Sequence, residues 1–221
     1  QWSSSAASDV YKRQDLAALI KVLSEKHKSK IVLGGHSIGG SLSIMASKLL
    51  NDKVDGLILA DPVVINYHYK YFTKFFGPLG YESNTIKLYR QALKKRSKWK
   101  SFDEVLKSYT NRGIFKTWKK GFLHDYLSGG TKKETSGVYL SCNPETEAAS
   151  FINTEKVTTP KIIKNINIPV LLLIAEFGST TASLGSFKKL KNLKLVERMQ
   201  GGSHFFPMEQ PDKLISFIKG F

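Results

Sequence analysis

Hydrophobic residues along the chain follow two patterns, which predict two kinds of element. In residues 15–26 (DLAALIKVLSEK), leucine and isoleucine recur at helical spacing. Short apolar runs without alternation are typical of buried parallel strands, and they occur at 30–35, 54–62, 168–176 and 193–199. Further helical patterns cover residues 37–51 and 207–221. Because strands alternate with helices, the pattern predicts an α/β fold with a mostly parallel sheet flanked by helices.

The pattern changes between the second and third apolar runs. Residues 62–150 are rich in aromatic residues and lysine, and they contain helical stretches without a buried strand run. We expect them to form a mainly helical cap, inserted into a core of residues 15–61 and 151–221, with a flexible turn at 128–137. An insertion after the end of a parallel strand lies where such sheets bind ligands. The aromatic residues at 67–76 either line an apolar pocket or pack the cap on the core.

Composition narrows the possible classes of protein. A chain of 221 residues with 41% hydrophobic residues can bury one sizeable core. No run of about 18 or more apolar residues occurs, so we expect no stable membrane insertion. The net charge of +16 comes from lysines scattered over every segment, without a nucleic-acid motif, which favours a solvated basic surface over nucleic-acid binding. The single cysteine, Cys142, predicts no internal disulfide and a reducing, cytoplasmic location.

The sequence Gly35-His36-Ser37-Ile38-Gly39 fits the pattern G-x-S-x-G between a predicted strand and a predicted helix. Such a turn is so sharp that it needs small neighbours, and it exposes the serine hydroxyl at the top of the sheet. The helix behind it directs the backbone N–H of Ile38 toward a developing oxyanion. A phosphate-binding loop is the other interpretation, but the chain lacks G-x-x-x-x-G-K-[ST]. We therefore predict that Ser37 is a nucleophile.

A nucleophilic serine needs a base, and His204 is the best placed of the five histidines. It lies in MQGGSHFFPMEQP, on a glycine-rich loop between the last predicted strand and the final helix. The other histidines are expected at a helix end, inside the turn and pointing away, or in the cap: His27, His36, His68 and His124.

At these residues the chain resembles the α/β-hydrolase fold family of the lipase and esterase type. The segments that carry the resemblance are GHSIGG, VDGLILADPVV, IPVLLLIAE and GGSHFFPMEQPDKLISFI, and it extends over most of residues 15–221. Within the expected cap, residues 96–130 and 137–151 resemble a subgroup of mostly uncharacterised hydrolases, some of which are similar to peroxisomal lipase and toxin-biosynthesis hydrolases. The resemblance implies a partial α/β-hydrolase fold with a helical cap. It says little about the substrate, because this fold supports many different reactions.

The third residue of the catalytic triad in this family is an acid that orients the histidine, and its place in this chain departs from the usual pattern. An aspartate usually follows the strand predicted at 168–176, and Gly178 stands in its place here. Two carboxylates remain open, Asp61 at the end of the strand before the cap and Glu176. Some family members take the acid from that earlier strand, and a carboxylate there can accept the Nδ1–H of His204. We therefore favour Asp61, although either carboxylate could instead hydrogen-bond a nearby loop.

The first residues of the chain do not fit the family pattern. Residues 4–14 (SSAASDVYKRQ) equal the translation of a transposase adapter used for sequencing libraries, so we expect residues 1–14 to be a disordered, adapter-derived scar. The family core has further strands before the nucleophile strand, and a second oxyanion donor follows one of them. We therefore expect a C-terminal part of a longer protein, with an unpaired strand edge at 30–35, poor solubility and low activity.

The leading hypothesis is a serine hydrolase that cleaves an ester or similar acyl bond of a small apolar or lipid-like substrate. No cofactor and no metal are expected, because no ligand cluster has the needed spacing. One alternative is a carbon–carbon bond hydrolase, whereas epoxide and haloalkane enzymes of this fold use a carboxylate nucleophile. The other alternative is a non-catalytic binding protein, which the absence of the usual aspartate favours.

Overall fold

The computed structural model describes residues 3–65, 84–157 and 160–221. Within these ranges the main sheet has four parallel strands in the order β1-β2-β6-β7. The strands are β1 (Ile31–His36), β2 (Val54–Ala60), β6 (Val170–Phe177) and β7 (Leu193–Ser203). Each predicted apolar run forms one of them, which confirms the α/β class. In the described ranges β1 is an edge strand, and its Val32 is 48% exposed.

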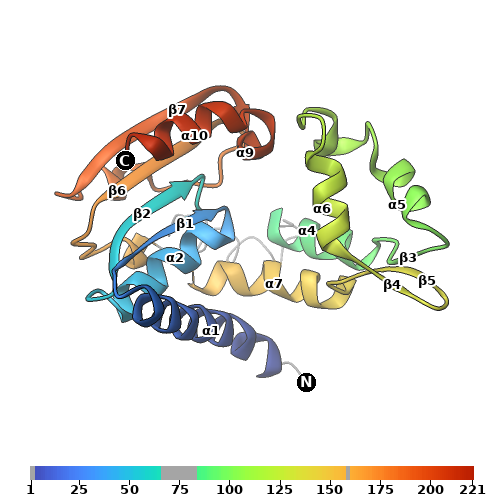
Figure 1. Ribbon diagram of the computed structural model, residues 1–221, viewed down its shortest axis with the longest axis horizontal. Coiled ribbons are helices and arrows are strands. Elements are labelled where there is room, and N and C mark those ends of the chain that lie inside the picture. The colour runs from blue at the N-terminus through green and yellow to red at the C-terminus, as the bar shows by residue number, and fades with distance from the viewer. Residues whose placement is uncertain (1–2, 66–83, 158–159) are drawn as a thin grey trace, which may run out of the picture.

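Helices cover both faces of this sheet (Figure 1). One face packs against α1 (Ser3–His27), α2 (Ile38–Leu49), the short α8 (Leu184–Phe187) and the 3-10 turn η3 (Pro160–Ile162). The other face packs against α9 (Phe206–Glu209) and α10 (Pro211–Lys219). Among the helices in the described ranges, none combines the length and the apolar character needed to cross a membrane.

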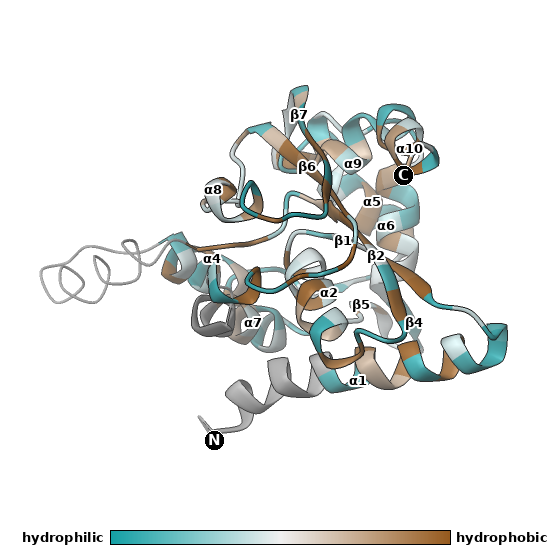
Figure 2. Cartoon of the chain, turned by 90° about the vertical axis from the view of Figure 1, so that its left-hand side faces the viewer, coloured by the Kyte–Doolittle hydropathy of each residue, from teal (hydrophilic) through white to brown (hydrophobic). Residues whose placement is uncertain are grey.

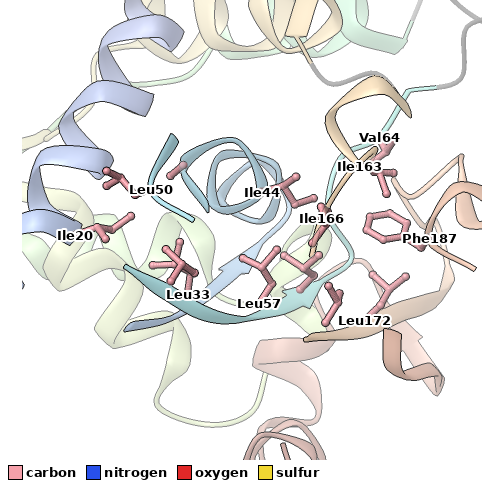
Figure 3. Close-up of a cluster of buried hydrophobic side chains, with 14 of the residues drawn as sticks. Ile20, Leu33, Ile44, Leu50, Leu57, Val64, Ile163, Ile166, Leu172 and Phe187 are labelled. Carbon is pink, nitrogen blue, oxygen red and sulfur yellow. The ribbon is translucent and has the colours of Figure 1, made fainter. Parts of the chain in front are cut away.

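Alternate residues of β6 enter two separate hydrophobic clusters. Leu172 points toward α2 and α8, into the larger cluster with Ile44 and Phe187 (Figure 3). Leu171 and Leu173 lie on the other face, against α9 and α10. Because successive strand residues point to opposite faces, a strand buried on both sides is apolar throughout. The hydropathy colouring accordingly shows brown segments along β2 and β6 (Figure 2).

The described part of the expected cap, residues 84–157, has its own small core and is not purely helical. Its helices are α4 (Asn84–Leu93), α5 (Phe102–Tyr109), the 3-10 turn η2 (Gly113–Lys116), α6 (Phe122–Gly130) and α7 (Pro144–Val157). A small antiparallel sheet joins them, in the order β3 (Lys98–Trp99), β5 (Gly137–Leu140) and β4 (Thr131–Glu134). The buried side chains of this core are Trp99, Val105, Leu127 and Val138.

The expected flexible turn at 128–137 is wrong, because it contains β4 and the start of β5. The strand β4 is an edge strand whose residues TKKE are mostly exposed, so no apolar alternation marked it. Gly137 has φ +137°, and a Cβ there would lie 2.4 Å from the backbone oxygen of Trp99. Glycine at this position lets the hairpin approach β3 closely.

Two expected boundaries differ from the structure. Helix α1 begins at Ser3, so residues 3–14 are helical where disorder was expected. This segment contains neither proline nor glycine, so nothing in it interrupts a helix. Helix α7 crosses the expected cap boundary at residue 150 and packs against both α4 of the cap and α1 of the core. The aromatic residues at 67–76 and His68 lie outside the described residues.

Candidate active site

Ser37 lies in a strained turn between β1 and α2. Its φ of 55° and ψ of −125° are rare for a residue with a side chain. Two hydrogen bonds hold this conformation: the Ser37 N–H donates to the Ala60 oxygen at 3.0 Å, and the Val63 N–H donates to the Ser37 oxygen at 3.2 Å. Backbone strain that the surroundings maintain is typical of functional sites.

Two glycines allow the chain to turn this sharply. One is Gly35 of the motif, and the other is Gly40, which follows the motif. A Cβ on Gly35 would lie 2.4 Å from the Gly39 oxygen, and one on Gly40 would lie 2.9 Å from the Pro62 Cβ. A Cβ on Gly39 would meet nothing within 4 Å. The expectation of small residues around Ser37 therefore holds for Gly35 but not for Gly39, because the first turn of α2 meets the core at Gly40.

The structure brings Ser37, Asp61 and His204 into one hydrogen-bonded chain. The His204 Nε2 lies 2.9 Å from the Ser37 Oγ, and the His204 Nδ1 lies 2.6 Å from the Asp61 Oδ2. His204 directly follows β7, whose last residue is Ser203, and its side chain is 16% exposed. With Asp61 accepting from Nδ1–H, Nε2 is free to accept the proton of the Ser37 hydroxyl.

Asp61 is fully buried and hydrogen-bonded from several sides. Besides His204, its carboxylate accepts from the Ser179 hydroxyl at 2.5 Å, the Thr180 N–H at 2.9 Å and the Ala175 N–H at 3.2 Å. Burial raises the pKa of Asp61, but the hydrogen bonds from His204 and the other donors outweigh it, so the pKa lies below its usual value. Asp61 also has a φ of 44°, so the backbone is strained at both Ser37 and Asp61.

Glu176, the alternative acid, lies elsewhere. It is exposed, and its carboxylate accepts the Gly201 N–H at 2.6 Å, which links the ends of β6 and β7. No hydrogen bond joins it to His204 among the described residues. Ser179 and Thr180 follow Gly178 and were not predicted as site residues. Hydroxyls without periodicity give no sign in a sequence that they will meet a carboxylate 118 or 119 positions away.

His36 contacts the backbone of His204, contrary to the expectation that it points away. Its Nε2–H donates to the backbone oxygen of His204 at 2.7 Å, and the two imidazole rings lie 4.7 Å apart. Burial lowers the pKa of His36 and outweighs the opposing effects of this hydrogen bond and of Asp61, which keeps the ring neutral. The remaining described histidines are remote from this contact, since His27 ends α1 and His124 packs on Phe102 in the cap.

The backbone N–H of Ile38 lies at the start of α2, directly after Ser37. Ile38 is the first residue of the helix, so its N–H has no acceptor within the helix. The positive end of the helix dipole adds to the attraction for a negative oxygen. Within the described ranges, no group of three or more histidine, cysteine, aspartate or glutamate side chains is arranged to hold a metal ion.

The sequence and the arrangement of this site agree with one family. Residues 2–217 match the profile of the Alpha/beta hydrolase family. The chain belongs to this family. Fold and family were thus predicted correctly from the strand pattern and the motif around Ser37. No curated protein matches the sequence of this alpha/beta hydrolase.

Solved structures share the fold at low sequence identity. The peroxisomal alpha-beta-hydrolase Lpx1 of Saccharomyces cerevisiae is 20% identical with a TM-score of 0.75, over 94% of this chain and 57% of that protein. E-2-(acetamidomethylene)succinate hydrolase is 16% identical with a TM-score of 0.66, over 95% and 71% of the two chains. A thermophilic esterase from Thermogutta terrifontis is 18% identical with a TM-score of 0.56, over 94% and 69%. This alpha/beta hydrolase thus spans 57% of the length of the yeast protein.

Proposed function

We propose that this alpha/beta hydrolase is a serine hydrolase that cleaves an ester or similar acyl bond through Ser37, His204 and Asp61. The observation that carries the proposal is the hydrogen-bonded chain from the Ser37 Oγ through the His204 ring to the Asp61 carboxylate. The three side chains come from the ends of β1, β7 and β2, and each fits one role in acyl transfer.

The reaction proceeds in two halves. The Ser37 Oγ attacks the acyl carbonyl while its proton passes to the His204 Nε2, and the Asp61 carboxylate stabilises the resulting imidazolium. The Ile38 N–H donates to the oxyanion of the tetrahedral intermediate. His204 then returns the proton to the leaving alcohol or thiol, and a water molecule activated by His204 hydrolyses the acyl-enzyme.

A small apolar or lipid-like substrate fits the aromatic residues beside the base. Phe205 lies next to His204 with its ring 5.2 Å away, and Trp118 of the cap lies 6.0 Å from Phe205. Aromatic side chains with a few polar groups are common in sites for small molecules. The cytoplasmic location stays a prediction that rests on the single cysteine, Cys142, which is a free thiol.

A series of p-nitrophenyl esters, from acetate to decanoate, tests the proposal. The protein is expressed from the longest reading frame that contains these residues, together with Ser37→Ala and, as a serine control, Ser216→Ala. Ser216 is an exposed residue of α10 that donates to Lys213. We expect hydrolysis by the wild type and Ser216→Ala, and a loss of about 10³-fold or more in Ser37→Ala.

Two other results would each support an alternative. If the esters stay intact while a 1,3-diketone is cleaved, the protein is a carbon–carbon bond hydrolase. If an ester stays intact but binds with measurable heat, the protein is a non-catalytic binding module of this fold.

A further inference from the structure

The cap contacts the residues that follow His204 through three consecutive positions, Thr117, Trp118 and Lys119. We name residues 117–119, which lie between η2 and α6, the cap latch. Figure 1 shows α9, which begins two residues after His204, on the side of the core that faces α6 of the cap. The cap latch therefore meets the core next to the base.

Each residue of the cap latch has a partner in residues 205–212. The Thr117 hydroxyl donates to the Glu209 Oε1 at 2.6 Å, and the Trp118 ring lies 6.0 Å from that of Phe205. The backbone N–H of Lys119 donates to the Met208 oxygen at 2.9 Å. The Lys119 ammonium group also pairs with Asp212.

Glu209 connects this contact to both chain neighbours of His204. Its Oε2 accepts the Ser203 N–H at 2.8 Å, and its Oε1 accepts the Ser203 hydroxyl at 2.7 Å. The same hydroxyl oxygen accepts the Phe205 N–H at 3.1 Å. Residues 203 and 205 are thus both held, directly or through Ser203, by one carboxylate, and the His204 backbone lies between them.

Glu209 is also held as a carboxylate. Burial raises its pKa, but the hydrogen bonds from Thr117 and Ser203 outweigh this effect, so the pKa lies below its usual value. A charged acceptor makes stronger hydrogen bonds than a neutral one, which suits a group that must fix a loop. The Thr117 hydroxyl is the cap's contribution to this group.

We propose that Glu209 is a positioning residue for His204 and that the cap acts on the base through the hydroxyl of Thr117. The proposal rests on the proposed function, in which His204 is the base. Docking of the cap latch completes the set of donors around Glu209, and this set fixes the backbone on both sides of His204. Rate constants for chemistry at Ser37 therefore depend on a cap residue that touches neither Ser37 nor His204.

The variant that tests this is Thr117→Val, which removes the hydroxyl and keeps the shape of the side chain. The matched control is Thr110→Val, because Thr110 is an exposed cap threonine whose hydroxyl donates to the backbone oxygen of Leu106, one turn earlier, at 2.7 Å. The measurement is the second-order rate constant for labelling by a small fluorophosphonate, together with kcat and KM for the best p-nitrophenyl ester.

We expect labelling and kcat to fall about fivefold in Thr117→Val, with KM nearly unchanged, because a hydrogen bond to a charged group is lost. Thr117→Ser restores both, and Thr110→Val changes neither. In Glu209→Gln, labelling and kcat fall by about tenfold or more. Adding Thr117→Val to this variant has no further effect, because the hydroxyl acts through Glu209. A merely structural role would lower the thermal midpoint without this split between kcat and KM.

The outcomes separate the two proposals. If the wild type is not labelled, the proposed function is wrong, and the role of Glu209 is wrong with it. If the wild type is labelled and Thr117→Val reacts as fast as Thr110→Val, only the proposed role of the cap latch is overturned. Additive losses in Thr117→Val and Glu209→Gln would also overturn it, because they would mean that the two residues act separately.

Discussion

The carboxyl ends of β2 and β6 are neighbours in the main sheet, and they differ in what they give to His204. β2 is followed by Asp61, which accepts the His204 Nδ1–H. The end of β6 is followed by Gly178, which has no side chain, and then by Ser179 and Thr180, which donate to Asp61. One strand end thus carries the buried carboxylate, and its neighbour supplies hydrogen bonds that keep this carboxylate charged.

Under the proposed triad, this division explains how a carboxylate after β2 can serve as the acid when glycine follows β6. A buried carboxylate is costly unless several donors surround it. The turn after β6 has Gly178 in place of a carboxylate, and it directs the Ser179 hydroxyl and the Thr180 N–H at Asp61, at the adjacent strand end. The carboxylate and two of its donors thus come from neighbouring strand ends of one sheet.

The largest expected effect separates Asp61 from Glu176. Asp61→Asn should lower kcat/KM by about 10⁴-fold, because the imidazolium loses its stabilising charge and the wrong tautomer of His204 is favoured. Glu176→Gln should stay within about twofold of the wild type, because Glu176 binds Gly201 and not the base. Steady-state ester hydrolysis by the two purified variants measures both values.

A third variant tests whether a carboxylate after β6 can replace Asp61. Gly178→Asp in the Asp61→Asn background should recover less than about tenfold of the lost activity, because a side chain at Gly178 starts in open space. Recovery to near wild-type activity would show that either strand end can supply the acid.

A smaller effect is expected for the donors after β6. Ser179→Ala removes a hydroxyl that donates to Asp61 at 2.5 Å, and we expect kcat/KM to fall about tenfold. The pKa of Asp61 should rise toward its usual value, so the loss should be greater at acid pH. A pH profile of kcat/KM that is superimposable on that of Ser216→Ala would mean that the end of β6 does not support the acid.

The smallest effect concerns stability. The pKa of folded Asp61 lies below the ordinary aspartate value of 3.8, because the hydrogen bonds from its donors outweigh burial. The ionised group therefore stabilises the fold above pH 3.8, and this contribution is lost as the pH falls through the lower folded-state pKa. Urea unfolding from about pH 6 to about pH 2 should show a steeper fall for the wild type than for Asp61→Asn. Equal slopes would mean that Asp61 is not held as an anion.

The sequence was informative where apolar periodicity or a local turn dictates structure. The four strands of the main sheet and the strand-turn-helix around Ser37 follow from such local patterns. The helical start of α1, the exposed strand β4 and the direction of His36 do not, because polar residues carry no periodic signal for their partners. Contacts such as Ser179 with Asp61 and Thr117 with Glu209 join residues 118 and 92 positions apart, and only the folded chain brings them together.

The site and rate of fluorophosphonate labelling, read by the mass of the modified peptide, decide whether Ser37, His204 and Asp61 act together. A triad of Ser37, His204 and Asp61 predicts one adduct, on the peptide that contains Ser37, which forms rapidly in the wild type and Glu176→Gln. The same adduct should form at least about 10³-fold more slowly in Asp61→Asn and not at all in Ser37→Ala. An adduct on another residue, or a rate that is unchanged in Asp61→Asn and reduced in Glu176→Gln, would show that these three residues do not form the triad.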